Sequence, residues 1–201
     1  MLAGRLPPST GVVTIDGRPS TVNDFNYMLQ DSNRLLFPHL TLRENLALLK
    51  ASAVKENNNV ARISEMLFRD DKTLKQYPIH CSGGQKQRAV LGRTIADIPS
   101  FSVSLLDEPF AQISQDVKPD VYSFLRGIVQ RSDCHVLMVT HDISEAMIVG
   151  DQVVVISSEA PQVFDVSVVT DAATYVKASA MRNAVRRAIF STDGPPSIKD
   201  M

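Results

Sequence analysis

Two stretches decide the fold of this chain: FSVSLLDEP at residues 101–109 and HVLMVTHD at residues 135–142. Each is a short apolar run that ends in polar or charged residues, which is typical of a buried strand followed by a loop. The pattern between and after them predicts helices over 117–130 and 143–149 and a further strand over 152–156. Strands that alternate with helices in this way are typical of an α/β fold, a parallel sheet covered by helices.

The first half of the chain interrupts this alternation. Short strands are predicted over 11–15, which ends in an Asp-Gly turn signal, and over 25–29. Between about residues 41 and 96 the apolar side chains instead recur at helical spacing, and Thr41 and Glu44 form a capping box at the start of the first helix. We therefore expect a helical subdomain over about 41–96, inserted into the sheet domain.

Four further segments can be assigned from their composition and periodicity. Residues 55–59 are polar and are expected to connect two helices, whereas residues 60–69 are amphipathic and predict a helix. Near the end of the sequence, we expect residues 171–190 to be helical and residues 192–201 to be a tail.

Composition and charge exclude several classes of protein. The chain has 201 residues, of which 44% are hydrophobic and 21% charged, and its formal net charge is -1. These values are typical of a folded globular domain, and they exclude a disordered, collagen-like or disulfide-stapled chain and any strong attraction to nucleic acid. Cys81 and Cys134 lack metal-ligand spacing. No apolar stretch is long enough to span a bilayer or to form a signal peptide, so we expect a cytoplasmic protein.

The carboxylates of Asp107 and Glu108 directly follow a predicted strand. The carboxyl end of a buried parallel strand is where α/β proteins bind ligands. In nucleoside triphosphatases an aspartate at this place holds Mg²⁺, and an adjacent glutamate can polarise the attacking water. A strand that simply ends in charged loop residues explains the pair equally well, so this motif alone leaves both interpretations open.

The sequence Ser82-Gly83-Gly84-Gln85 is a second candidate. Two glycines allow a ligand to approach the backbone closely, and Ser82 is a favourable N-cap residue. The free amides at the start of the helix that follows favour a phosphate group. The alternative is a glycine-rich turn that only caps a structural helix, and an isolated Ser-Gly-Gly sequence is more often of that kind.

Two single residues complete the candidate set. His141 directly follows a strand, where it could donate to a phosphate or position a water molecule near neutral pH. Gln30 ends an earlier strand and could bind Mg²⁺ or orient water. For each of them, an ordinary structural or loop residue is the simpler interpretation.

The order and spacing of these four motifs resemble those of ATP-binding cassette (ABC) transporter ATPase subunits. In that comparison Gln30 falls on the glutamine loop, residues 81–85 on the signature motif, residues 105–108 on the Walker B motif and His141 on the switch histidine. The resemblance extends from residue 2 to about residue 157.

The sequences that flank the motifs are similar to the same family. LFPHLT at residues 36–41 and THDISEA at residues 140–146 look most like importer subunits of the nitrate, sulfonate and taurine group. The resemblance implies a P-loop NTPase-like parallel sheet with an inserted helical subdomain. It further implies a nucleotide-binding domain over residues 1–157, followed by a C-terminal extension over residues 158–201.

The resemblance also implies cofactors, partners and residue roles. With ATP and Mg²⁺ bound, Glu108 would act as general base, Asp107 and Gln30 would bind Mg²⁺, and His141 and Gln30 would sense the γ-phosphate. Residues 82–85 would serve the nucleotide held by a second ATPase subunit, in a homodimer or a heterodimer. The other implied partner is a membrane permease, with no nucleic acid involved, and the implied location is the cytoplasmic face of the cell membrane.

The sequence departs from the family pattern in one major respect. None of its nine glycines is followed by lysine, so the phosphate-binding loop Gly-x-x-x-x-Gly-Lys-Ser/Thr is absent. In addition, Ser104 interrupts the apolar run of Walker B, and Ser114 stands where the family generally has an aspartate, which Asp116 can replace only with a shifted loop. We expect an N-terminally truncated importer ATPase, inactive and marginally stable alone. The alternative is a non-catalytic pseudo-ATPase module that supplies its signature motif to an intact partner.

Overall fold

The fold is known from a computed structural model, which describes residues 8–29, 35–48, 57–156 and 162–165. The chain divides into two compact units, Met1–Val139 and Thr140–Met201. None of the helices within the described ranges is long and apolar enough to cross a membrane.

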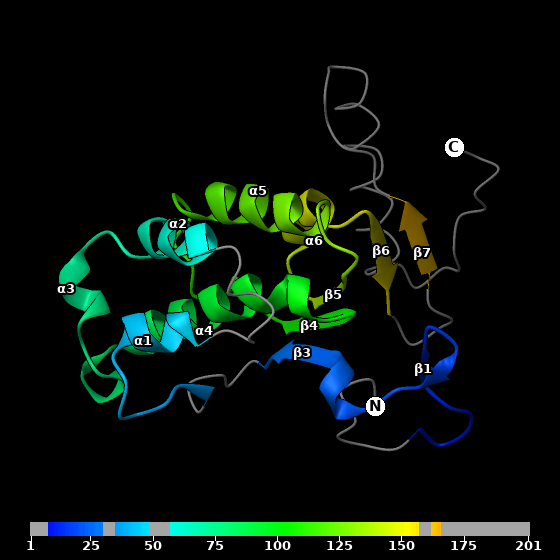
Figure 1. Ribbon diagram of the computed structural model, residues 1–201. Helices are drawn as coiled ribbons and strands as arrows, with labels where there is room; N and C mark the ends of the chain where they lie inside the picture. The colour runs from blue at the N-terminus through cyan, green and yellow to red at the C-terminus, as the bar shows by residue number, and fades with distance from the viewer. Residues whose placement is uncertain (1–7, 30–34, 49–56, 157–161, 166–201) are drawn as a thin grey trace. The chain divides into compact units, whose positions relative to one another are not determined.

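The first unit is built on a three-stranded parallel sheet in the order β3-β4-β5 (Figure 1). Its strands are β3 (Phe25–Met28), β4 (Val103–Asp107) and β5 (His135–Val139). The central strand β4 pairs with β3 on one side and with β5 on the other. The prediction of a parallel sheet is therefore confirmed. Because the strands run in one direction, their carboxyl ends lie at one edge, where Asp107 is the last residue of β4.

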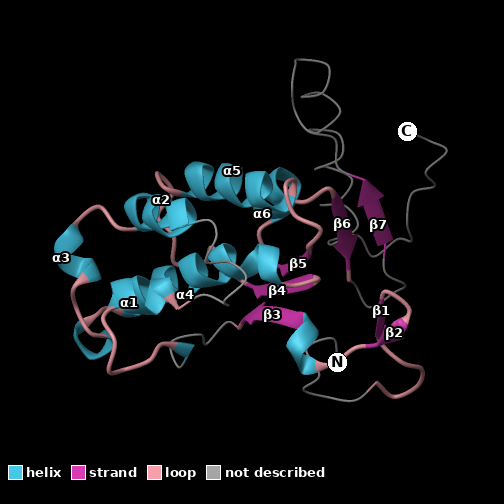
Figure 2. Cartoon of the chain, viewed as in Figure 1, coloured by secondary structure: helices cyan, strands magenta, loops and turns pink. Residues whose placement is uncertain are grey.

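The described residues between β3 and β4 contain four α-helices, in the part of the sequence where the helical subdomain is predicted (Figure 2). They are α1 (Leu42–Ala47), α2 (Asn57–Leu67), α3 (Asp71–Leu74) and α4 (Gly83–Asp97). Helix α4 contacts α1 and α2 as well as strand β3. It therefore joins the helical subdomain to the sheet.

Local sequence signals start these helices. At α1, the Thr41 N–H donates to Glu44 Oε2 at 2.7 Å and the Glu44 N–H donates to Thr41 Oγ1 at 3.2 Å, which confirms the predicted capping box. The short helix α3, capped by Asp70, is not predicted by the sequence. Helix α2 begins at Asn57, so the prediction of a connector over 55–59 is wrong for its last three residues. The first turn of a helix supplies carbonyl acceptors rather than core contacts, and it therefore carries no apolar signal.

Gly92 allows α1 and α2 to pack closely against α4. A Cβ at this position would lie 2.7 Å from Leu46 Cδ2, 2.8 Å from Ile63 Cγ2 and 3.0 Å from Leu67 Cδ1. All three of these side chains are at most 1% exposed, so none of them can swing aside. Any side chain larger than hydrogen at residue 92 would push the helices apart.

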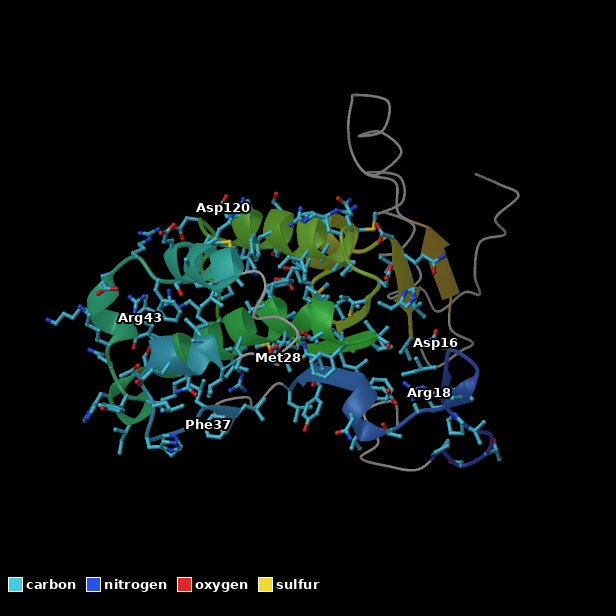
Figure 3. All side chains as sticks on the ribbon, in the orientation of Figure 1. Asp16, Arg18, Met28, Phe37, Arg43 and Asp120 are labelled. Carbon is cyan, nitrogen blue, oxygen red and sulfur yellow. The ribbon has the colours of Figure 1, made fainter. Side chains whose placement is uncertain are left out.

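Buried residues of β3, of the loop after β4 and of the helix α5 (Lys118–Val129) form part of the core of the first unit. Met28, at the end of β3, is 1% exposed (Figure 3). Tyr122 of α5 lies edge-on to Phe110, with the ring centroids 4.9 Å apart, and Phe110 is fully buried. This aromatic pair fixes the loop that follows β4 to the core. The buried residues of α5 are Lys118, Val121, Tyr122, Phe124, Leu125 and Ile128.

A small hairpin precedes the sheet. Strand β1 (Thr14–Ile15) pairs antiparallel with β2 (Arg18–Pro19), which the sequence analysis did not predict, and β1 occupies only the end of the predicted strand 11–15. Asp16, labelled in Figure 3, and Gly17 have positive φ values of 51° and 76°. These left-handed conformations are those that the predicted Asp-Gly turn requires.

Within residues 140–156 and 162–165, the second unit has one helix and an antiparallel pair of strands: α6 (Ile143–Val149), β6 (Gln152–Val155) and β7 (Gln162–Asp165). The strand predicted over 152–156 is present, but its partner within the described ranges is β7, and the pairing is antiparallel. The alternating pattern predicted parallel neighbours for this strand. That prediction is wrong within the described ranges, because the order of elements along the chain does not determine which strands pair. Among the described residues of this unit, Met147, Val153 and Val155 form a buried cluster, packed against Ile143 and Ala146.

Several predictions fall on residues outside the described ranges. These are the helix over 171–190, the tail over 192–201 and the position of Gln30. The domain boundary after residue 157 also stays a prediction.

Candidate functional site

Strand β4 delivers Asp107 and Glu108 to the carboxyl edge of the sheet. The Glu108 N–H donates to the Val139 carbonyl at 2.9 Å, so this residue is still bonded to β5 although β4 has ended. The φ of Glu108 is 46°, in the left-handed region, which costs a non-glycine residue roughly 1 kcal/mol. Backbone strain of this kind concentrates at functional positions, and here it falls on the residue predicted to be the general base.

The side chains of Asp107 and Glu108 are half-buried. Among the residues that the structure describes, no cluster of three or more His, Cys, Asp or Glu side chains could hold a metal ion. Mg²⁺ is commonly bound by one or two carboxylates together with phosphate oxygens and water, so two adjacent carboxylates fit a Mg²⁺ that arrives with a nucleotide. The pair does not fit a metal held by protein ligands alone.

The N-terminus of α4 is organised by a reciprocal cap. The Ser82 N–H donates to Gln85 Oε1 at 2.8 Å, and the Gln85 N–H donates to Ser82 Oγ at 3.2 Å. Within the described ranges, no acceptor takes the backbone N–H groups of Gly83 and Gly84. These two donors lie at the positive end of a 15-residue helix, where an anion is favoured.

Gly83 and Gly84 are not required by the packing of the described residues. A Cβ on Gly83 would have its nearest neighbour, Gln112 Oε1, at 3.8 Å, and a Cβ on Gly84 would lie 3.5 Å from the same atom. Both distances are ordinary contacts, and neither glycine has a positive φ. A glycine within a helix costs about 1 kcal/mol relative to alanine. At Gly92, by contrast, a Cβ would clash, so the packing of the described residues explains Gly92 but not the pair at residues 83–84.

A buried polar network explains why Ser104 interrupts the apolar run of β4. Asn26 of β3 lies opposite Ser104 in the sheet, and its Nδ2 donates to the Thr94 carbonyl of α4 at 2.9 Å and to Ser104 Oγ at 3.4 Å. Ser104 Oγ in turn lies 3.4 Å from Cys134 Sγ. Asn26 is not among the residues that the sequence predicts to be important. Its signal was the occurrence of one polar residue in each of two apolar strands, but the register that pairs them is visible only in the structure.

The two cysteines are free, and both are buried. Burial raises the pKa of the Cys81 thiol, which donates to the Tyr77 carbonyl at 3.3 Å. Burial likewise raises the pKa of the Cys134 thiol. A thiol with a raised pKa is protonated at neutral pH and a poor nucleophile, so Cys81 acts as a small apolar residue ahead of the glycine pair.

The loop after β4 contains Ser114, which departs from the family pattern, and Asp116, the residue that could replace the missing aspartate. The Ser114 carbonyl accepts from the Val117 N–H at 3.0 Å and from the Lys118 N–H at 3.2 Å, and it thereby begins α5. The Asp116 carboxylate pairs with the guanidinium of Arg69, just beyond α2. In this structure Asp116 is thus used within the chain, and its predicted substitution for the missing aspartate stays a prediction.

His141 belongs to the second unit, in the turn that precedes α6, and it is exposed. Asp142 caps this helix by accepting from the N–H groups of Ser144 and Glu145, and Thr140 Oγ1 donates to Glu145 Oε2 at 2.9 Å. These bonds hold the turn that presents His141. The predicted grouping of His141 with Glu108 stays a prediction.

Comparison with known proteins decides the family. The family model described as ABC transporter matches residues 1–111. The chain belongs to the ABC transporter family. The probable sulfate/thiosulfate import ATP-binding protein CysA of Chlorella vulgaris is 34% identical over 164 residues, which cover 79% of this chain and 69% of the relative. The sulfate/thiosulfate import protein of Thermosynechococcus vestitus is 36% identical, with 78% and 48% covered. The nitrate import protein NrtD of Synechocystis is 32% identical, with 79% and 60% covered.

Solved ABC structures share the fold. A dimeric ATP-binding cassette in a post-hydrolysis state with ADP and Pi superimposes with a TM-score of 0.57 at 21% identity, over 74% of this chain and 69% of that one. An ATP-binding subunit of an ABC transporter gives a TM-score of 0.57 at 21% identity, over 76% and 65%. The predicted α/β fold of the P-loop NTPase type is therefore confirmed. The chain spans between about half and two-thirds of the length of these curated ABC relatives.

Proposed function

We propose that this chain is the ATP-binding subunit of an ABC importer, in which ATP binding and hydrolysis drive the transport of a small solute. The observation that carries the proposal is the glycine pair at residues 83–84. It lies at an exposed helix N-terminus with free amides, and no contact within the described chain requires it. The relatives are import ATP-binding proteins for sulfate or thiosulfate, nitrate and Fe(3+) ions, which supports an import function.

The proposal assigns a role to each predicted site residue. Ser82 Oγ and the amides of Gly83 and Gly84 bind the phosphates of a nucleotide that a second ABC subunit holds, with Gln85 keeping Ser82 in place. Asp107, with Gln30, holds the Mg²⁺ of the chain's own nucleotide. Bound Mg²⁺ would neutralise charge that develops on the phosphates. Glu108 takes a proton from the attacking water, and His141 and Gln30 contact the γ-phosphate.

The 201 residues contain no Gly-Lys pair, so the phosphate-binding loop for this chain's own half-site has to come from elsewhere. Further residues of the same polypeptide would make a complete ATPase. The second candidate function, a non-catalytic module that lends residues 82–85 to an intact partner, is favoured by Ser114 in place of the family aspartate. The strained φ of 46° at Glu108 favours the catalytic form, because a module without hydrolysis gains nothing from that strain.

The proposed partners are a second ABC ATPase subunit and a membrane permease, and the proposed location is the inner face of the cell membrane. The solved dimer with ADP and Pi supports pairing of two cassettes. For the solute, a nitrate- or sulfonate-type oxyanion, or taurine, is the finer proposal. The sulfate and nitrate relatives support an oxyanion, whereas the relative that imports Fe(3+) ions is equally similar at 32% identity.

A fusion protein tests the function. The segment of the Thermosynechococcus vestitus relative that precedes its match to this chain is joined to the full 201 residues, so that the relative supplies a phosphate-binding loop. We expect this fusion to hydrolyse Mg-ATP. Its Glu108→Gln variant should lose hydrolysis and form a dimer that depends on Mg-ATP, measured by analytical ultracentrifugation.

The variant Ser82→Arg tests whether the ATP-dependent dimer uses residues 82–85, which both candidate functions require. Ser82 is exposed, so arginine fits sterically and blocks the phosphate site. Because it also removes the N-cap of α4, at a cost of about 1 kcal/mol, circular dichroism first establishes that the variant is folded. Loss of the ATP-dependent dimer in Ser82→Arg supports the proposal. A dimer that forms with Mg-ATP but never hydrolyses it, with Glu108 intact, supports the non-catalytic module. A fusion that is folded, binds Mg-ATP and shows no ATP-dependent dimer contradicts both.

A further inference from the structure

The loop that follows β4 brings one more polar side chain, Gln112, to the start of α4. We propose that Gln112 is a further phosphate-binding residue of the site formed by residues 82–84, donating a hydrogen bond from its side-chain amide to a phosphate oxygen. The proposal rests on the function proposed above, which it extends by one residue and one contact.

The position of Gln112 is given by the two glycines. Its Oε1 is the nearest atom to a Cβ placed on either one, at 3.8 Å for Gly83 and 3.5 Å for Gly84. The Gln112 Cβ and backbone carbonyl lie 4.0 Å and 3.9 Å from the same position on Gly84. The side chain therefore lies against the first turn of α4, next to the two glycines whose backbone N–H groups lack an acceptor within the described ranges.

Two buried neighbours fix the loop on either side of Gln112. Phe110 is fully buried against Tyr122, and Ile113 is 5% exposed, with its N–H donating to the Phe110 carbonyl at 3.1 Å. The Ala111 N–H donates to the Glu108 carbonyl at 3.3 Å. Gln112 itself is exposed. A loop that is anchored on both sides presents its side chain at little cost in backbone entropy when a ligand binds.

The chemistry of the amide fits a phosphate. No hydrogen bond of the Gln112 side chain is present among the described residues, so both its donors are available. A half-turn of the amide about its last torsion exchanges Oε1 for Nε2 at the same place, which converts an acceptor that faces the glycines into a donor. With Ser82 Oγ and two backbone amides, the site then offers four donors and no carboxylate of its own to a phosphate.

The test measures phosphate binding by the full 201-residue chain, labelled with ¹⁵N. Inorganic triphosphate and, separately, Mg-ATP are titrated while the amide signals of Gly83 and Gly84 and the side-chain amide signals of Gln112 are followed. We expect these signals to shift together and to saturate in the millimolar range. Gln112→Ala should weaken binding about tenfold, the factor expected for one hydrogen bond to a charged group. Gln112→Glu should weaken it further, because a carboxylate repels the phosphate.

Gln115→Ala is the matched control, since Gln115 is an exposed glutamine in the same loop and is not among the atoms near the glycines. It should bind like the parent chain. Signals of Gly83 and Gly84 that shift equally in the parent and in Gln112→Ala would overturn the role of Gln112 and leave the function proposed above intact. If neither glycine signal moves in a folded parent chain, and the fusion described above also shows no ATP-dependent dimer, both proposals are overturned. If the fusion dimerises and the glycine signals stay still, the Gln112 proposal alone is overturned.

Discussion

Replacing single glycines of α4 by alanine should change stability in opposite directions. Gly92→Ala inserts a methyl group 2.7 Å from Leu46 Cδ2 and 2.8 Å from Ile63 Cγ2, where both side chains are at most 1% exposed. Overpacking of this kind costs about 1–3 kcal/mol, and the better helix propensity of alanine offsets about 1 kcal/mol. With two such short contacts we expect Gly92→Ala to lower the free energy of unfolding by about 1–2 kcal/mol.

Gly84→Ala should do the reverse. The new methyl group would have its nearest neighbour at 3.5 Å, and that neighbour is the exposed end of Gln112. Nothing opposes the gain from helix propensity and from the reduced entropy of the unfolded chain, which together give about 0.5 kcal/mol in the first turn. Gly127→Ala in α5, where a Cβ would meet only the Arg131 guanidinium at 3.3 Å, is the reference for a helical glycine with room.

Urea unfolding followed by far-ultraviolet circular dichroism measures all three variants against the parent chain. We expect equal m-values, a lower midpoint for Gly92→Ala and midpoints at or above the parent for the other two. The difference between Gly92→Ala and Gly84→Ala should be about 2 kcal/mol. A Gly84→Ala variant that is destabilised as strongly as Gly92→Ala would show that the glycine at residue 84 is required by the fold, and it would remove the main support for a ligand at this helix.

Three further predictions follow from other contacts. Asn26→Ala removes the donor to the buried Thr94 carbonyl and should cost about 1–3 kcal/mol of unfolding free energy in urea, whereas a cost below the error of the measurement would show that water replaces the bond. Glu108→Gly should exceed Glu108→Ala in stability by roughly 1 kcal/mol, because only glycine adopts φ 46° without strain; equal midpoints would contradict strain at this residue. Hydrogen bonds from the Thr41 N–H and, to a lesser extent, from the Thr41 hydroxyl lower the pKa of Glu44. The stabilisation from this capping box is therefore fully present above the ordinary pKa range of glutamate and is lost as the pH falls through the folded-state pKa. The melting temperature should drop below about pH 4, and it should drop by less in Glu44→Gln.

The parts of the fold that depend on local signals could be predicted from the sequence. The capping box at Thr41, the N-cap at Ser82, the Asp-Gly turn at residues 16–17 and the strand that ends at Asp107 all lie where the sequence places them. Each depends on residues within about four positions of one another, and such contacts leave a direct trace in the sequence. The parallel sheet could also be predicted, because strands and helices alternate along the second half of the sequence.

The parts that depend on register or distant contacts could not be predicted. Nothing local to Ser104 indicates that Asn26, far away in the sequence, lies opposite it, and nothing local to Gln112 places it beside Gly84. The same limit applied to β6, whose antiparallel partner is outside the alternating pattern. For the candidate site, sequence resemblance supplied the roles of the residues. The structure adds that no contact among the described residues requires the glycine pair, which supports the proposal that the pair binds a ligand.

One measurement tests that conclusion most directly. In the fusion that carries Glu108→Gln, the dissociation constant of the Mg-ATP-dependent dimer is compared with and without Gly84→Ala by analytical ultracentrifugation. We expect a methyl group at residue 84 to weaken the dimer at least tenfold, since it lies where a phosphate contacts the backbone, while the free energy of unfolding does not fall. A dimer of unchanged affinity in Gly84→Ala would contradict phosphate binding at the start of α4.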